Sequence, residues 1–118
     1  MNKIEQAQQI AWVEWFTWQY RDLAPLLHHS PNGGSRNLLE AKKFKAMGVR
    51  AGFPDLFLAI PSNGFHGLFV ELKSAKGRLS DGQKAYHELL RRQGYRVEVV
   101  KDFDTFKKII EEYLYRKL

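Results

Sequence analysis

Pro54-Asp55-Leu56-Phe57-Leu58-Ala59-Ile60 and Leu68-Phe69-Val70-Glu71-Leu72-Lys73 are two apolar runs whose pairing decides the fold of this chain. The proline and glycines between them predict a turn, and therefore a hairpin of two strands. Residues two apart in a strand point to the same side, so Glu71 and Lys73 share one face. If Asp55 opens the first strand and Glu71 lies in its neighbour, the two carboxylates can converge on one cation. One face of the hairpin then packs, while the other presents a hard-metal site beside a positive charge.

The same residues allow a structural alternative, in which Glu71 and Lys73 form an ion pair. A carboxylate within so apolar a run is costly to bury unless it has a cation or hydrogen-bond partners. The ion pair would satisfy Glu71 but would leave Asp55 unexplained. The pattern therefore favours a metal site over a simple pair.

Residues 3–22 predict a helix, because they contain no proline or glycine and carry apolar side chains at spacings of three and four. We expect that apolar stripe to form the first wall of the core; its members are Ile4, Ala7, Ala11, Trp15 and Trp18. A second stripe, Glu5, Gln9 and Trp12, could face the sheet with its polar end over the carboxylate pair. Glu5 also fits a helix cap with Asn2. Glu14 points roughly the opposite way from Glu5, so at most one of these two glutamates can be a ligand.

Residues 24–37 predict a loop that can include a brief strand. Within it, Asn32-Gly33-Gly34 offers backbone amides that can approach a phosphate, although most such turns are only turns. A second helix is expected over residues 38–47, ended by Gly48. Its basic side chains and those beside it either contact a nucleic-acid backbone or form a solvated face. These residues are Arg36, Lys42, Lys43, Lys45 and Arg50.

The last third of the chain predicts a basic loop at Lys76-Gly77-Arg78, a helix over residues 80–93, a strand over residues 96–100 and a final helix from Asp102 or Asp104. Ser80 and Gln83 fit a capping box, which competes with a role for Gln83 in the site. The whole order is helix, optional strand, helix, strand, strand, helix, strand, helix. It predicts a small mixed sheet flanked by helices, with the last two strands parallel.

Composition narrows the class of protein. A chain of 118 residues with 44% hydrophobic content is sufficient for one domain, residues 1–118, with a real core. The absence of cysteine excludes disulfides, thiolate zinc sites and a cysteine nucleophile, and it fits a reducing cytoplasm. No signal-peptide pattern and no membrane-spanning run are present, so we expect a cytoplasmic protein without a membrane partner. The net charge of +6 favours an anionic partner, nucleic acid first, or else a solvated basic surface.

The ordered set of motifs resembles the PD-(D/E)XK nuclease superfamily and, more closely, its VRR-NUC family. The set consists of Glu5 with Gln9, Pro31-Asn32-Gly33-Gly34 with Arg36, Gly48-Val49-Arg50-Ala51-Gly52-Phe53-Pro54-Asp55-Leu56, His66-Gly67-Leu68, Glu71-Leu72-Lys73, Gly77-Arg78-Leu79-Ser80 with Gln83, and Gly94-Tyr95-Arg96-Val97. The resemblance covers nearly the whole chain. It implies an α/β fold with a restriction-endonuclease-like core, and a single VRR-NUC nuclease domain.

The resemblance also implies a metal-dependent endonuclease. Stand-alone members of the family, typical of phages and bacteria, look like Holliday-junction resolvases that act as homodimers. The resemblance thus implies branched DNA as substrate, in a bacterial or phage-infected cell. Members with extra domains cut flap-like DNA, so a flap or non-specific nuclease is an alternative. A non-catalytic nucleic-acid-binding module and a structural subunit are the rivals from other classes.

For the site, the resemblance implies that Asp55, Glu71 and the main-chain carbonyl of Leu72 bind Mg²⁺ or Mn²⁺. Glu5 would be an outer ligand or would hold a second ion. Lys73 would orient the attacking water, and Gln83 would help to fix Lys73 or the water. We expect DNA contacts from Asn32, Gly33, Arg36, Lys42, Lys43, Lys45, Arg50, Lys76 and Arg78. No small organic cofactor is expected.

Two further expectations come from residue types. The histidines are expected in loops, in turns or on the surface rather than as ligands; they are His28, His29, His66 and His87. The first helix carries more aromatic side chains than one stripe can hide, which makes it a candidate dimer interface. Those aromatic residues are Trp12, Trp15, Phe16, Trp18 and Tyr20.

Overall fold

A four-stranded sheet lies at the centre of the computed structural model, which describes residues 1–31 and 38–115. Its strands adjoin in the order β1 (Leu27–His29), β2 (Leu56–Leu58), β3 (Leu68–Leu72) and β4 (Arg96–Val100). The first two pairs are antiparallel, and β3 and β4 are parallel. The predicted mixed α/β fold is confirmed, including the hairpin and the parallel pair that follows it.

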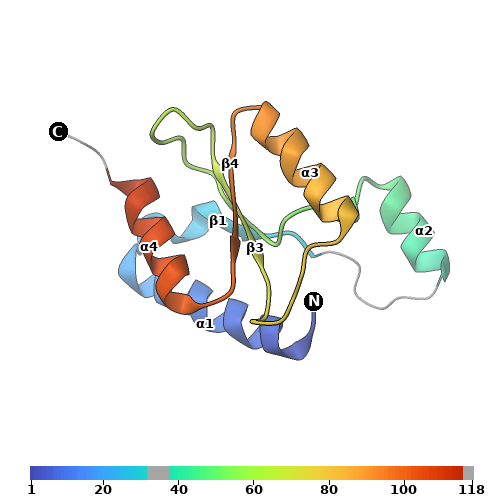
Figure 1. The fold of residues 1–118 in the computed structure, drawn as a ribbon, viewed down its shortest axis with the longest axis horizontal. Coiled ribbons are helices and arrows are strands. Elements are labelled where there is room, and N and C mark those ends of the chain that lie inside the picture. The colour runs from blue at the N-terminus through green and yellow to red at the C-terminus, as the bar shows by residue number, and fades with distance from the viewer. Residues whose placement is uncertain (32–37, 116–118) are drawn as a thin grey trace.

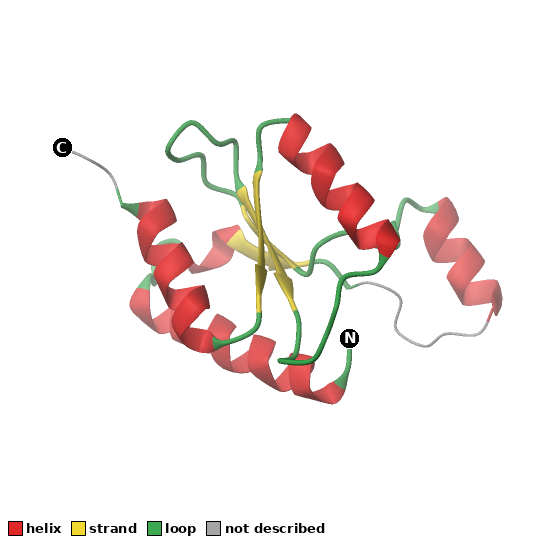
Figure 2. Cartoon of the chain, viewed as in Figure 1, coloured by secondary structure: helices red, strands yellow, loops and turns green. Residues whose placement is uncertain are grey.

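Helices cover both faces of this sheet (Figure 1). α1 (Lys3–Gln19) and α4 (Phe103–Leu114) lie on one face, and α3 (Asp81–Arg92) lies on the other. α2 (Leu38–Ala46) stands apart at one end of the molecule and buries no residue (Figure 2). A short 3-10 turn, Ala24–Leu26, leads into β1. None of the helices in the described part of the chain is long and apolar enough to cross a membrane.

The helix ends follow the predicted capping chemistry. Gly48, at φ +108°, ends α2, and the N–H of Val49 donates to the carbonyl of Phe44 at 2.9 Å. Asp102 caps α4 by accepting from the N–H of Thr105 at 2.8 Å. α1 ends at Gln19 rather than at residue 22, because Tyr20 leaves the helical conformation and its ring packs on Phe16, with the centroids 5.1 Å apart.

The main core lies between the sheet and the pair α1 and α4. It consists of Trp12, Phe16, Leu56, Leu58, Ile60, Leu68, Val70, Leu72, Val100, Phe106, Ile109, Ile110 and Tyr113. The stripe predicted to carry α1 into this core was wrong, since Ile4 is 63% exposed and Trp18 is 71% exposed. Trp12 and Phe16 face inward instead, where the Trp12 ring stacks on Phe106 with centroids 5.1 Å apart. Of the predicted stripe, Trp15 packs against the edge of this core, partly buried.

A second, aromatic layer lies between the sheet and α3. Phe57 and Phe69 stack on neighbouring strands with their ring centroids 4.4 Å apart. Phe53, from the turn before β2, meets Phe69 on one side and Tyr86 of α3 on the other, each with centroids 5.2 Å apart. α3 is therefore fixed against the sheet face that carries Glu71.

Candidate active site

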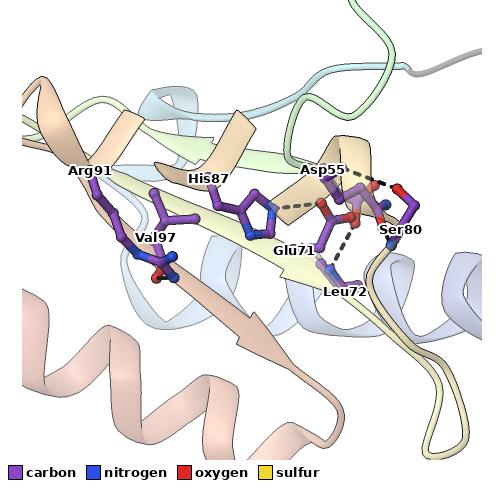
Figure 3. A network of polar contacts seen from close by, with 8 residues as sticks. Asp55, Glu71, Leu72, Ser80, His87, Arg91 and Val97 are labelled. Atoms are coloured by element: carbon purple, nitrogen blue, oxygen red, sulfur yellow. Dashed lines mark hydrogen bonds and ion pairs between the residues drawn. The ribbon is translucent and has the colours of Figure 1, made fainter. Parts of the chain in front are cut away.

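The carboxyl groups of Asp55 and Glu71 meet at one end of the sheet (Figure 3). Asp55 directly precedes β2, and Glu71 is the penultimate residue of β3. Because β2 and β3 are antiparallel, with Leu56 opposite Val70, the start of one strand adjoins the end of the other. Both residues are buried, at 6% and 2% exposure. The structure thus brings together the two carboxylates that the hairpin pattern predicted.

Backbone groups hold Asp55 in place. Its Oδ2 accepts a hydrogen bond from the N–H of Leu72 at 2.8 Å, which is drawn in Figure 3. Its main-chain carbonyl accepts from the N–H of Ser30 at 3.0 Å and lies 2.8 Å from Nδ1 of His29. β1 and β3 therefore fix this residue from opposite sides of β2.

Glu71 is held by a residue that the sequence analysis did not assign to the site. Nε2 of His87 lies 3.1 Å from Oε1 of Glu71, and His87 is 1% exposed (Figure 3). The expectation that His87 lies on the surface was wrong, because α3 turns this position toward the sheet. Gln83, His87 and Leu90 are four and three residues apart, so one helix face carries all three. That spacing, starting from Gln83, was the signal that could have found it.

The alternative ion pair between Glu71 and Lys73 is not formed among the residues that the structure describes, where the close partner of Glu71 is His87. Lys73 is half-buried directly after β3. Its positive charge nevertheless acts on Glu71, since it lowers the pKa of that carboxyl. Lys73 is therefore close enough to shift the pKa of Glu71, although the two side chains form no ion pair in the described part of the chain.

Burial is the largest cause of the pKa shift of both carboxyl groups. It raises the pKa of Asp55 to about 7, and the hydrogen bond and the charge of Glu71 add to that shift. Burial also raises the pKa of Glu71, against which the hydrogen bond from Asp55 and the charge of Lys73 act. The interaction between the two groups raises the pKa of Asp55 and lowers that of Glu71, so it favours protonation of Asp55 over Glu71. Because burial disfavours the ionised form of both carboxyl groups, a bound cation would stabilise the ionised pair.

Glu5 lies near the pair and also serves its helix. Asn2 caps α1 by accepting from the N–H of Glu5 at 2.8 Å. Oε2 of Glu5 accepts from the side-chain amide of Asn2 and from the N–H of Ser74, both at 3.1 Å. The negative charge of Glu5 also contributes to raising the pKa of Glu71. The start of α1 is thus tied to the segment that follows β3, with its carboxylate beside the site.

Gln83 forms the predicted capping box at the start of α3. Its Oε1 accepts from the N–H of Ser80 at 2.9 Å, and its own N–H donates to Oγ of Ser80 at 3.1 Å. The side-chain oxygen of Gln83 thus has a structural role, while its amide nitrogen remains a donor that could serve the site.

The donor set fits a hard divalent ion. Carboxylate oxygens are the ligands that Mg²⁺ and Mn²⁺ prefer, and Mg²⁺ is often held by only one or two carboxylates. Within residues 1–31 and 38–115, no group of three or more Asp, Glu, His or Cys side chains could hold an ion together. The protein side chains in direct contact would then be Asp55 and Glu71, with the remaining places left to main-chain, water and phosphate oxygens.

Those basic residues expected to contact DNA that the structure describes lie on exposed segments. Lys76 and Arg78 are exposed in the loop between β3 and α3. Lys42, Lys43 and Lys45 are exposed on α2, and Arg50 in the turn after it donates to the carbonyl of Lys45 at 3.4 Å. Asn32, Gly33 and Arg36 lie outside the described residues.

Comparison with known proteins gives a family match and a structural match. A family model described as the VRR-NUC domain matches residues 2–103 of the chain. A solved structure described as a VRR_NUC domain protein aligns with a TM-score of 0.82 and 33% sequence identity, over 97% of this chain and 90% of that one. A search of curated proteins gave no match.

Proposed function

This chain belongs to the VRR-NUC family of nuclease domains, and from that premise we propose that it is a metal-dependent, structure-selective DNA endonuclease. The proposed substrate is branched DNA, with four-way junctions first, and the proposed reaction is hydrolysis of a phosphodiester bond. The observation that carries the proposal is the buried pair of Asp55 and Glu71, with the pKa of Asp55 raised to about 7 beside the charge of Lys73. A buried, strained carboxylate pair is unfavourable in a purely structural role.

Each residue of the site has a separate role in the proposed reaction. Asp55, Glu71 and the main-chain carbonyl of Leu72 would hold Mg²⁺ or Mn²⁺. When bound, such an ion lowers the pKa of water and polarises the scissile phosphate. Lys73, on the same strand face as Glu71, orients the attacking water and offsets the negative charge that develops on the phosphate. Glu5 acts from the start of α1 in an outer position, and the side-chain nitrogen of Gln83 helps to fix Lys73 or the water.

Segments outside the hairpin of β2 and β3 would determine which DNA structure is bound. The exposed lysines of α2 and the basic loop at Lys76 and Arg78 neutralise backbone phosphates of the DNA. A four-way junction has two symmetric scissile strands, whereas one chain carries one site, so a two-fold homodimer matches enzyme to substrate.

The aromatic residues of α1 offer less for a dimer than their number predicted. Trp12 and Phe16 are buried in the chain's own core, while Trp18 is 71% exposed with the guanidinium of Arg21 4.7 Å from its ring centroid. A dimer contact through α1 would therefore centre on Trp18. Light scattering at the working concentration measures the mass; a monomer that still cuts both strands of a junction would remove the homodimer from the proposal.

The function is tested by incubating labelled four-way junctions, flaps and plain duplexes of the same sequence with the protein and Mn²⁺ or Mg²⁺. The junction is expected to be cut fastest, and EDTA is expected to stop the reaction. Asp55→Asn and Lys73→Ala are expected to abolish cutting while junction binding is kept. Cutting retained by Asp55→Asn would sink the assignment of the site. Binding without cutting by the wild type would support a non-catalytic module, and equal rates on all three substrates would reject structure selectivity.

A further inference from the structure

His87 is the buried titratable residue that the roles above do not use. It lies in the middle of α3, at 1% exposure, and its ring points from the helix toward Glu71 (Figure 3). Its Nε2 is 3.1 Å from Oε1 of Glu71. Most buried polar groups are hydrogen-bonded, and this contact is the one that His87 makes through Nε2.

The surroundings of the ring assign its proton. Nε2 faces Oε1 of Glu71 at 3.1 Å, and the oxygen of an ionised carboxyl group can only accept a hydrogen bond. Nδ1 has no hydrogen-bond partner among the described residues, and a proton there would face no acceptor. The tautomer that carries its proton on Nε2 donates a hydrogen bond to the carboxylate of Glu71, so it has the lower free energy of the two. His87 is therefore a donor to Oε1.

Each carboxyl group of the pair is thus held through one oxygen. The N–H of Leu72 holds Oδ2 of Asp55 at 2.8 Å, and Nε2 of His87 holds Oε1 of Glu71. The two carboxyl groups also lie close enough for each to shift the pKa of the other. One donor comes from β3 and the other from α3, so the orientation of the pair depends on both layers.

We propose that His87 is a positioning residue for the divalent-ion site, whose Nε2–H fixes Oε1 of Glu71 and so keeps the carboxylate turned toward Asp55. The inference rests on the proposed nuclease function. Without this donor, Glu71 has a competing partner in Lys73, which lies two residues on along the same strand face. A carboxylate that turned to Lys73 would leave the ion site and would also occupy the lysine. Residues that orient metal ligands typically change ion affinity or activity 10-fold to 100-fold when they are replaced.

The test compares His87→Gln with His87→Asn and His87→Leu. The side-chain nitrogen of glutamine can take the place of Nε2, whereas that of asparagine matches Nδ1 and falls short of Glu71. Calorimetric titration of the DNA-free protein with Mn²⁺ should give His87→Gln an affinity within about threefold of the wild type, and the other two variants an affinity at least about tenfold weaker. In single-turnover cleavage, the cutting rate should follow the same order while the affinity for the junction stays constant.

Leu90→Ala serves as the matched control, because it loosens the same face of α3 one turn further on without removing a donor to Glu71. It is expected to lower thermal stability but to leave Mn²⁺ affinity unchanged. If His87→Leu folds and binds Mn²⁺ as the wild type does, or if His87→Gln is as weak as His87→Leu, the inference is overturned. If His87→Leu does not fold, the glutamine and asparagine pair carries the test alone. A wild type that binds no Mn²⁺ would overturn the ion site as well, whereas a wild type that binds Mn²⁺ but cuts no DNA would overturn only the proposed function.

Discussion

The two faces of β3 are equally buried and yet made of different chemistry. Leu68, Val70 and Leu72 turn to the main core at 0% to 1% exposure. On the other face, Phe69 packs in the aromatic layer, and Glu71 lies beyond it against His87. The hydrocarbon face contributes stability by burial, whereas the carboxylate at the end of the other face opposes folding unless its charge is compensated. The side chains that stabilise the fold and the side chain proposed to bind the ion therefore lie on opposite faces of β3. Replacing residues on one face at a time tests this separation.

The functional face is the face of β3 that carries Phe69 and Glu71, opposite the hydrocarbon face. Glu71→Gln should have the largest effect of any change on it. Losing the carboxylate removes a direct ion ligand and should lower the single-turnover cleavage rate about 10³-fold or more. The carbonyl of glutamine can still accept from His87, and the like charge beside the buried Asp55 is removed. The free energy of unfolding at pH 8 in EDTA should therefore be equal to or above that of the wild type. Urea denaturation measures it. A loss of stability comparable to a core truncation would contradict the separation of the two faces.

Leu68→Ala makes the opposite change on the hydrocarbon face. Leu68 is 0% exposed, so the truncation leaves a cavity and should lower the free energy of unfolding by about 2 to 5 kcal/mol. Its position at the start of β3, away from Glu71, should keep the cleavage rate of the folded protein within about threefold of the wild type. Denaturation and single-turnover assays on the same preparation give both numbers. A rate loss like that of Glu71→Gln in fully folded protein would show that the core face also sets the site geometry.

The sequence was sufficient to predict this two-faced strand, because residues two apart share a side, which places Glu71 and Lys73 opposite Leu68, Val70 and Leu72. It was also sufficient for the capping box of Ser80 and Gln83, which is a local feature of four residues. It did not decide which stripe of α1 faces the core, since both stripes have helical spacing and the choice depends on ring stacking against Phe106, nearly a hundred residues later in the chain. His87 was missed because a histidine amid charged and polar helix neighbours has the pattern of a surface residue, and only its partner on β3 explains its burial.

The pH dependence of stability should reveal the strain on the functional face. The pKa of Asp55 rises from 3.8 to about 7 on folding, so between these pH values the native state holds a proton that the unfolded state has lost. The contribution of Asp55 to stability in EDTA should therefore fall as pH rises from about 4 to about 7, by a few kcal/mol. Asp55→Asn should lack this slope and should unfold at a higher temperature than the wild type at pH 8. Parallel curves for both proteins would show that Asp55 carries no strain.

Gly52→Ala should give a smaller effect by moving the turn that carries Asp55. Gly52 has φ +85°, and a Cβ there would lie 3.1 Å from the carbonyl carbon and oxygen of Gly82 in the first turn of α3. Strain and crowding should cost about 1 to 2 kcal/mol of stability and should lower the cleavage rate more than Leu68→Ala does. Gly82→Ala is the matched control, because its Cβ would meet only Oγ of Ser80, at 3.9 Å. If both alanine variants behave alike, the close approach of the two glycines does not position the site.

The smallest effect is expected on α2, which takes part in neither face of β3. Lys42 and Lys43 are exposed on a helix that buries no residue, so replacing either with alanine should leave stability unchanged. If each neutralises one phosphate, each replacement should reduce the slope of log binding constant against log salt concentration by about 0.9. Fluorescence anisotropy with a labelled junction, in EDTA to prevent cutting, measures that slope at several salt concentrations. Lys107→Ala, on α4 against the hydrocarbon face, provides a control of equal charge change and should leave the slope as it is. An equal reduction from Lys107→Ala would mean that DNA responds to the net charge of the chain rather than to a path across α2 toward the carboxylate pair.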